Sequence, residues 1–248
     1  MSEHIRVAVA EGVCTVTIDR AEKKNSLTRA MYAGLADAVE MAAREDAVRC
    51  LLLTGSGDVF CAGNDIGEFR NRPADDGPPP SKRFYFGLAN FEKPVVAAVP
   101  GLAIGIGCTM LMHADIIYAA PEARFRLPFV DLGVVPELGS SLLLPWLAGH
   151  HRASELMLLG EFFDAATAKE IGLVNRLVPL PELLPNATAT AAALARKPAE
   201  ALRLTKSLLR RDRPALLARM EEERVIFARQ LASPETQAIM AGVLKPKA

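Results

Sequence analysis

The sequence lacks an excess of charge of either sign. In 248 residues, 29 Lys and Arg are balanced by 29 Asp and Glu. A balanced chain carries no electrostatic footprint for nucleic acid or for an anionic membrane surface, so we expect neither as a partner. A local basic cluster lies near the C-terminus (Lys206, Arg210, Arg211, Arg213). A solvated helix face is favoured there over an anion site.

Long hydrophobic runs are also lacking. A membrane-spanning helix needs about 18 consecutive apolar residues. The most apolar stretch, PVVAAVPGLAIGIGCTMLM, is interrupted by Pro100, Gly101, Gly105 and Gly107. The opening residues MSEHIRVAV show no signal-peptide pattern, and the closing residues LKPKA are no peroxisomal address. These features predict a cytoplasmic protein that does not bind membranes.

Cysteine is scarce and scattered. Cys14, Cys50, Cys61 and Cys108 lie in apolar contexts, without CxxC or metal-ligand spacing. They are typical of small core residues in a reducing compartment. Histidines and carboxylates are not spaced as ligands either, so we expect no metal site.

The first half of the chain alternates strand and helix patterns. IRVAVAEGVCTVTIDR predicts a hairpin turning at Glu11 and Gly12, and SLTRAMYAGLADAVEMAARED predicts an amphipathic helix with Ser26 as N-cap. VRCLLLTGSG, PVVAAVPG and DIIYAA are nearly all apolar, which is typical of strands buried on both faces. This order predicts α/β units with parallel strands. The polar, proline-rich segment 69–83 predicts a loop, and from Leu138 onward the pattern is helical.

Two glycine-rich turns share the order strand, glycine turn, helix: TGSGDVFCAGNDIGEF (54–69) and VPGLAIGIGCTML (99–111). Amides at a helix start are unpaired, and two such turns facing each other could bind one anionic oxygen, as an oxyanion hole does. On the residues alone, glycines that permit tight strand-to-helix packing are the favoured alternative. Neither turn is a phosphate loop, because Cys108 and Thr109 follow Gly107 where Lys and Ser or Thr are required.

Glu137 is the single charged residue in LGVVPELGSSLLL (132–144). Proline at the first helical position followed by glutamate is a favourable helix opening, so Pro136 predicts a helix start. The apolar flanks favour instead a carboxylate held in an apolar pocket. Both interpretations stay open on these residues. His113, on an apolar helix, is interpreted as a hydrogen-bonded core residue.

Four segments occur in an order that resembles the crotonase superfamily (enoyl-CoA hydratase/isomerase): FCAGNDI, VPGLAIGIGCTMLMHADIIYAA, RFRLPFVDLGVVPELGSS and LMLLGEFFDAATAKEIGLVNRLVP. The resemblance runs over about residues 5–245. It implies an α/β fold, a spiral of ββα units, with a helical C-terminal trimerisation region. The core would span residues 1–195 and the helical region 196–248, and the assembly would be a homotrimer or a dimer of trimers.

The resemblance also implies an acyl-CoA thioester substrate and no separate cofactor. The thioester oxygen would lie between the backbone N–H groups of Asn64 and Ile106. The other substrate-binding positions that it implies are Lys24, Ala62, Gly63, Asp65, Ile66, Gly105, Phe129, Val134 and Leu138.

The acidic residues distinguish this sequence from the hydratases that it resembles. The two positions where hydratases carry glutamate are Thr109 and Phe129. PELGSS instead resembles the turn that carries the single catalytic glutamate of peroxisomal-type 3,2-trans-enoyl-CoA isomerases. The resemblance therefore implies that Glu137 moves a proton of a 3-enoyl-CoA from carbon 2 to carbon 4. The alternatives are another acyl-CoA reaction here (hydrolysis, decarboxylation or hydratase-like chemistry) and a non-catalytic acyl-CoA-binding protein.

Overall fold

The larger of two sheets has six strands in the order β1-β2-β3-β5-β7-β10. The computed structural model describes residues 3–70, 79–210 and 212–243. Strands β1 and β2 form the expected hairpin, in which Glu11 and Gly12 have φ of 49° and 78°. The other neighbours pair in parallel. The strands span Ile5–Ala10, Val13–Ile18, Cys50–Gly55, Val95–Val99, Ile116–Ala119 and Arg176–Leu177.

The second sheet has four strands in the order β4-β6-β8-β9, which span Val59–Cys61, Leu102–Ile104, Arg124–Arg126 and Phe163–Asp164. Strand β4 follows β3 along the chain, β6 follows β5, and β8 follows β7. Each such pair therefore places one strand in each sheet before the chain moves on. This is the spiral of ββα units that the sequence predicted, and the α/β fold is confirmed.

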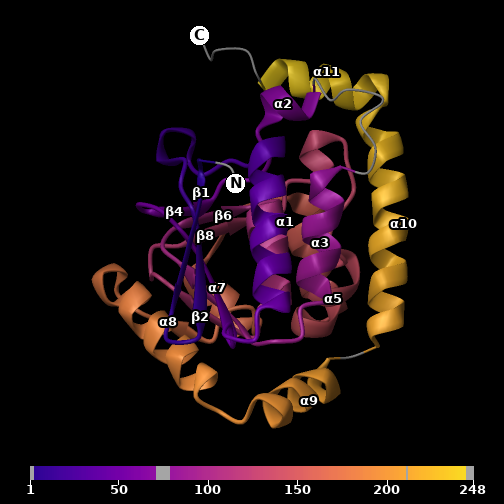
Figure 1. The fold of residues 1–248 in the computed structure, drawn as a ribbon. Coiled ribbons are helices and arrows are strands. Elements are labelled where there is room, and N and C mark those ends of the chain that lie inside the picture. Colours follow the sequence, from indigo (N-terminus) through magenta and orange to yellow (C-terminus); the bar gives the residue numbers. More distant parts are fainter. Residues whose placement is uncertain (1–2, 71–78, 211, 244–248) are drawn as a thin grey trace.

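Eleven α-helices occur in the described residues, and α1, α4, α7 and α8 lie against strands of the sheets. Figure 1 shows α1 and α3 side by side, with the long helix α10 beyond α3 and α11 crossing near α2. The bounds of α1 to α6 are Arg29–Arg44, Ile66–Arg70, Pro80–Ala89, Ile106–Thr109, Ser140–Ala148 and His150–Leu159. Those of α7 to α11 are Ala165–Glu170, Leu180–Ala195, Ala199–Leu209, Arg213–Leu231 and Pro234–Val243.

Three local expectations were wrong. The N-cap of α1 is Thr28, whose side chain accepts a hydrogen bond from the Met31 amide, rather than Ser26. The segment 69–83 is not a loop throughout: α2 ends at Arg70 and α3 starts at Pro80, where proline suits the first helical turn. Residues 71–78 of that expected loop lie outside the described residues. The helical second half also contains two short strands, β9 and β10.

Two residues of the basic cluster near the C-terminus, Arg210 and Arg213, hold the end of α3. Arg210 donates to the Ala89 carbonyl, and Arg213 donates to the side chain of Asn90, the C-cap of α3. Cationic side chains at a helix C-terminus pair with its free carbonyls and its dipole. Arg210 and Arg213 are therefore held by the protein rather than lying on a solvated face, and Arg211 lies outside the described residues. Trimerisation through the helices after residue 195 stays a prediction, as does a domain boundary at that point. Of the helices in the described ranges, none is both long and apolar enough to cross a bilayer.

Candidate active site

The two glycine-rich turns lie next to each other because the strands before them are neighbours. β4 and β6 pair in parallel, so the turns that follow their carboxyl ends leave the sheet at the same edge. Gly107 sets their separation: a Cβ atom there would lie 2.3 Å from the Cys61 carbonyl oxygen. Tight packing against Cys61 thus explains why position 107 is glycine, which was the favoured interpretation of the sequence. The same close approach brings the two turns together.

Backbone pairing orients the amide expected to act as the first oxyanion donor. The Leu27 amide donates to the Gly63 carbonyl at 2.8 Å, and the Asp65 amide donates to the Leu27 carbonyl at 2.9 Å. Successive amides of an extended chain point to opposite sides, so the intervening Asn64 N–H points away from Leu27. Ile106 is the first residue of α4, so its amide has no acceptor within that helix.

Glu137 lies in an irregular turn, and the helix-opening interpretation was wrong. Helix α5 begins at Ser140 with Gly139 as N-cap, four residues later than Pro136 would place it. Leu138 has φ of +60°, a strained value for a residue with a side chain. Three hydrogen bonds hold this turn: His113 Nε2 with the Leu138 carbonyl at 2.8 Å, and the amide and hydroxyl of Ser140, which both donate to the Glu137 carbonyl.

His113 is the hydrogen-bonded core residue that the sequence predicted. It is buried, and burial lowers its pKa to about 4. The ring is therefore neutral near pH 7. Because a carbonyl oxygen only accepts, the proton of that ring sits on Nε2 and is donated to Leu138.

The C-terminal helices fix both ends of the segment that carries Glu137. On α11, the Thr236 hydroxyl donates to the Gly133 carbonyl at 2.7 Å, and a Cβ at Gly133 would lie 2.6 Å from that hydroxyl oxygen. On α10, the buried carboxylate of Glu223 accepts from the Gly139 amide at 2.6 Å and from the Ser141 amide and hydroxyl at 3.0 and 2.6 Å. No sequence motif indicated Glu223.

Glu137 is only 7% exposed as a residue. Burial raises its pKa to about 7; a hydrogen bond from Tyr85 lowers the pKa, and the charge of Glu223 raises it. Oε2 accepts that hydrogen bond from the Tyr85 hydroxyl at 2.7 Å. Oε1 is buried, and within the described part of the chain it has no hydrogen-bond partner. A carboxyl with a pKa near 7 can both accept and donate a proton at neutral pH.

Two tyrosines join Glu137 to the first glycine-rich turn. The Tyr85 hydroxyl on α3 lies 3.1 Å from that of Tyr32 on α1, and Tyr32 donates to the Asn64 side chain at 2.5 Å. The sequence analysis missed both. Tyr85 fell at the edge of a segment interpreted as loop, where no helix face could be assigned. Tyr32 follows Met31 on a helix where the apolar pattern indicated only core packing.

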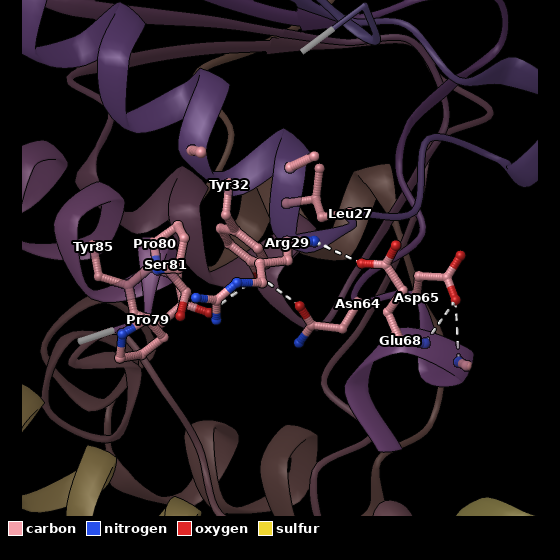
Figure 2. A pocket seen from close by; sticks show the side chains of 13 residues that line it. Leu27, Arg29, Tyr32, Asn64, Asp65, Glu68, Pro79, Pro80, Ser81 and Tyr85 are labelled. Atoms are coloured by element: carbon pink, nitrogen blue, oxygen red, sulfur yellow. Dashed lines mark hydrogen bonds between the residues drawn. The ribbon is translucent and has the colours of Figure 1, made fainter. Parts of the chain in front are cut away.

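A cavity of about 840 Å³ opens beside this chain of hydrogen bonds. Figure 2 shows Tyr32 and Asn64 in the middle of it, with Pro79, Pro80 and Ser81 on one side and Asp65 and Glu68 on the other. Tyr85 also lines the cavity, whereas Glu137 is not among the described lining residues. Tyr85 therefore connects the lining of the cavity to the carboxylate.

The structure places the remaining predicted residues in two groups. Around the first turn, the exposed Lys24 offers its carbonyl to the Ala62 amide at 3.0 Å, and Asp65 binds Arg20 at 2.7 Å while capping the start of α2. Ile66 opens that helix. Around Glu137, three of the expected residues are buried: Phe129, Val134 and Leu138.

Thr109 and Phe129, which the resemblance assigns to the two glutamate positions of the hydratases, are both buried. Neither side chain is acidic, so neither can take a proton from water in the way those hydratases require. Within the described ranges, no three His, Cys, Asp or Glu side chains gather as possible metal ligands.

Comparison with known proteins identifies the family. The family model for enoyl-CoA hydratase/isomerase matches residues 8–244. The chain belongs to the enoyl-CoA hydratase/isomerase family. The crystal structure of an enoyl-CoA hydratase/isomerase from Pseudoalteromonas atlantica T6c is 40% identical, with a TM-score of 0.95 over 99% of this chain and 98% of that one.

Two curated relatives are named as isomerases. The 1,2-epoxyphenylacetyl-CoA isomerase of Escherichia coli K12 is 39% identical over 84% of this chain and 82% of its own length. The enoyl-CoA delta isomerase 2 of Rattus norvegicus is 32% identical over 99% of this chain and 65% of its own length. This chain is thus similar to about two thirds of the rat protein. As a member of this family, the chain is an acyl-CoA enzyme. The family name covers two kinds of reaction, hydration and isomerisation.

Proposed function

We propose that this enzyme moves the double bond of a 3-enoyl-CoA to give the 2-trans-enoyl-CoA, with Glu137 as the only carboxyl that carries the proton. The observation that carries the proposal is the buried Glu137 carboxyl, whose pKa is raised to about 7 and whose Oε1 has no partner among the described residues. A water-adding enzyme of the kind discussed above needs carboxylates at positions 109 and 129. This chain has threonine and phenylalanine there.

In this mechanism, the thioester oxygen lies between the amides of Asn64 and Ile106. Glu137 removes a proton from carbon 2, and the negative charge spreads onto the thioester oxygen, where the two amides stabilise it. The protonated carboxyl then returns the proton to carbon 4, and the double bond ends between carbons 2 and 3. Each oxyanion donor contributes about 3 kcal/mol in comparable sites. The other substrate contacts (Lys24, Ala62, Gly63, Asp65, Ile66, Gly105, Phe129, Val134 and Leu138) are part of this proposal.

The test is to incubate the enzyme with 3-hexenoyl-CoA and to follow the absorbance of the conjugated product. Glu137→Gln keeps the shape of the side chain but cannot exchange a proton, so we expect at least a 1,000-fold loss of activity, on the order of 4 kcal/mol, with CoA binding retained. Wild-type activity in this variant would refute the assignment of Glu137.

Two further arms separate other reactions of the same site. Incubation with a 2-trans-enoyl-CoA in water tests hydration, and free CoA release tests thioester hydrolysis. An epoxyphenylacetyl-CoA tests the reaction named for the Escherichia coli relative. Turnover of any of these compounds without turnover of 3-hexenoyl-CoA would replace the proposal with that reaction.

A further inference from the structure

The two oxygens of the Glu137 carboxyl are not equivalent. Oε2 accepts a 2.7 Å hydrogen bond from Tyr85, whereas Oε1 is buried with no partner among the described residues. A buried acceptor without a partner destabilises a fold, so such an atom calls for an explanation in function. One oxygen is held by the protein, and the other is left to react.

The Tyr85 side chain is itself held in place. Its ring packs edge-on against Tyr32, at 5.8 Å between ring centroids, and against Phe84, at 6.1 Å. Its hydroxyl also contacts that of Tyr32. Burial, with the charge of Glu137 adding to it, raises the pKa of Tyr85 well above its usual range, so the phenol keeps its proton. Tyr85 is thus a fixed donor, because an ionised carboxylate can only accept.

We infer that Tyr85 is a positioning residue for the base: it binds Oε2 of Glu137 and so leaves Oε1 as the oxygen that exchanges the proton with the acyl chain. This inference rests on the proposed function for the identity of the reaction. The hydrogen bond between Tyr85 and Glu137 is a feature of the structure and does not depend on that proposal. Tyr85 lines the cavity and also binds the Glu137 carboxyl, so it connects the two. Its hydrogen bond stabilises the ionised carboxylate more than the protonated carboxyl.

Other titratable groups that act on this carboxyl come from several elements. Tyr32 on α1 and Cys61 on β4 are both buried, and the charge of Glu137 adds to the effect of burial in raising their pKa values. Glu223 on α10 raises the pKa of Glu137. His113 binds the carbonyl of the next residue and is neutral near pH 7. Within the described part of the chain, none of these four groups forms a hydrogen bond with the carboxyl oxygens of Glu137, whereas Tyr85 does, so removal of the Tyr85 hydroxyl changes the base most directly.

The test is the pH profile of kcat/KM for Tyr85→Phe, which keeps the ring and removes only the hydroxyl. Without its donor the carboxylate is less stable, so the acid limb should move up by about one pH unit. At pH 6 kcat/KM should fall about tenfold, and most of the loss should be regained at pH 9. An equal loss at all pH values, with an unmoved acid limb, would overturn the inference in favour of a purely structural role.

Tyr32→Phe is the matched control. It removes the hydroxyl that contacts Tyr85 and Asn64 but leaves the bond from Tyr85 to Glu137. A shift of the acid limb well below that of Tyr85→Phe supports the assignment. A shift equal to it would overturn the assignment, because the effect would then belong to the tyrosine pair rather than to the contact with Oε2.

A second readout does not depend on the reaction. The infrared band of the protonated carboxyl, taken as the difference between wild type and Glu137→Gln, can be titrated without substrate. Its midpoint should rise in Tyr85→Phe. If 3-hexenoyl-CoA is not isomerised but the midpoint rises, the proposed function fails and the role of Tyr85 stands. An unmoved midpoint in an active enzyme would overturn the role of Tyr85 alone.

Discussion

Glu137 should weaken the fold at neutral and alkaline pH, and replacing it with glutamine should stabilise the protein. Its pKa is raised from 4.5 to about 7, so the folded state holds the carboxyl proton more tightly than the unfolded chain. Because the folded state binds this proton more tightly than the unfolded chain, the contribution of Glu137 to the free energy of unfolding is highest at low pH, where the carboxyl is protonated in both the folded and the unfolded protein. The contribution is complete below about pH 4.5 and is lost as the pH rises through about 7.

The size of the effect follows from the same rise. A change of one pKa unit corresponds to about 1.4 kcal/mol, so the rise from 4.5 to about 7 gives about 3 kcal/mol. Glutamine is neutral at every pH and has nearly the same shape. The free energy of unfolding of Glu137→Gln should therefore equal that of wild type near pH 4 and exceed it by about 3 kcal/mol at pH 8 and above.

Urea unfolding of both proteins at intervals between pH 4 and pH 9 measures this gap. Other buried groups also titrate in this range, including His113, whose pKa burial lowers to about 4, and Lys206, whose pKa it lowers to about 8. Both are present in the two proteins, so their contributions cancel in the difference. The exposed Glu182→Gln serves as the control for the chemical change itself. A gap that stays constant with pH would refute the reasoning.

The remaining predictions concern the groups that place the two turns and the base. Gly107→Ala would put a Cβ atom 2.3 Å from the Cys61 carbonyl oxygen and force the turns apart. We therefore expect the free energy of unfolding to fall by about 1–3 kcal/mol and kcat to fall at least 100-fold. In the control Gly242→Ala, the added Cβ meets nothing within 4 Å, so neither quantity should change. Glu223→Gln removes an acceptor and a negative charge beside Glu137, so kcat/KM should fall about tenfold while the acid limb moves to lower pH, opposite to Tyr85→Phe. An acid limb that moves up in Glu223→Gln, or an active Gly107→Ala, would contradict these assignments.

The sequence was sufficient for five of the six strands of the larger sheet, because local pattern and burial agree there. It did not indicate β4, β6, β9 or β10, which have only two or three residues each. The nearly all-apolar segments became β3, β5 and β7, whose parallel pairing requires both faces to be covered. The hairpin turned at Glu11 and Gly12 as expected, since glycine accepts a positive φ readily.

The site was harder to predict because its decisive contacts join residues far apart in the chain. Tyr85 is separated from Glu137 by 52 residues and from Tyr32 by 53, and Glu223 lies 84 residues after Gly139. No spacing rule connects such positions. The start of α5 was misplaced for a related reason: the left-handed conformations of Leu138 and Gly139 depend on contacts with His113 and Glu223.

The two anchors on the segment around Glu137 also set the order in which a newly made chain becomes active. The sheets and both glycine-rich turns are complete by about residue 177, but Thr236 and Glu223 emerge from the ribosome much later. Until α10 and α11 dock, nothing from them holds Gly133 or Gly139, and the segment around the base has only the contacts from Tyr85, His113 and Ser140. The sheets therefore form from the earlier part of the chain, and the segment that carries the base is anchored at both ends only when the last helices are in position.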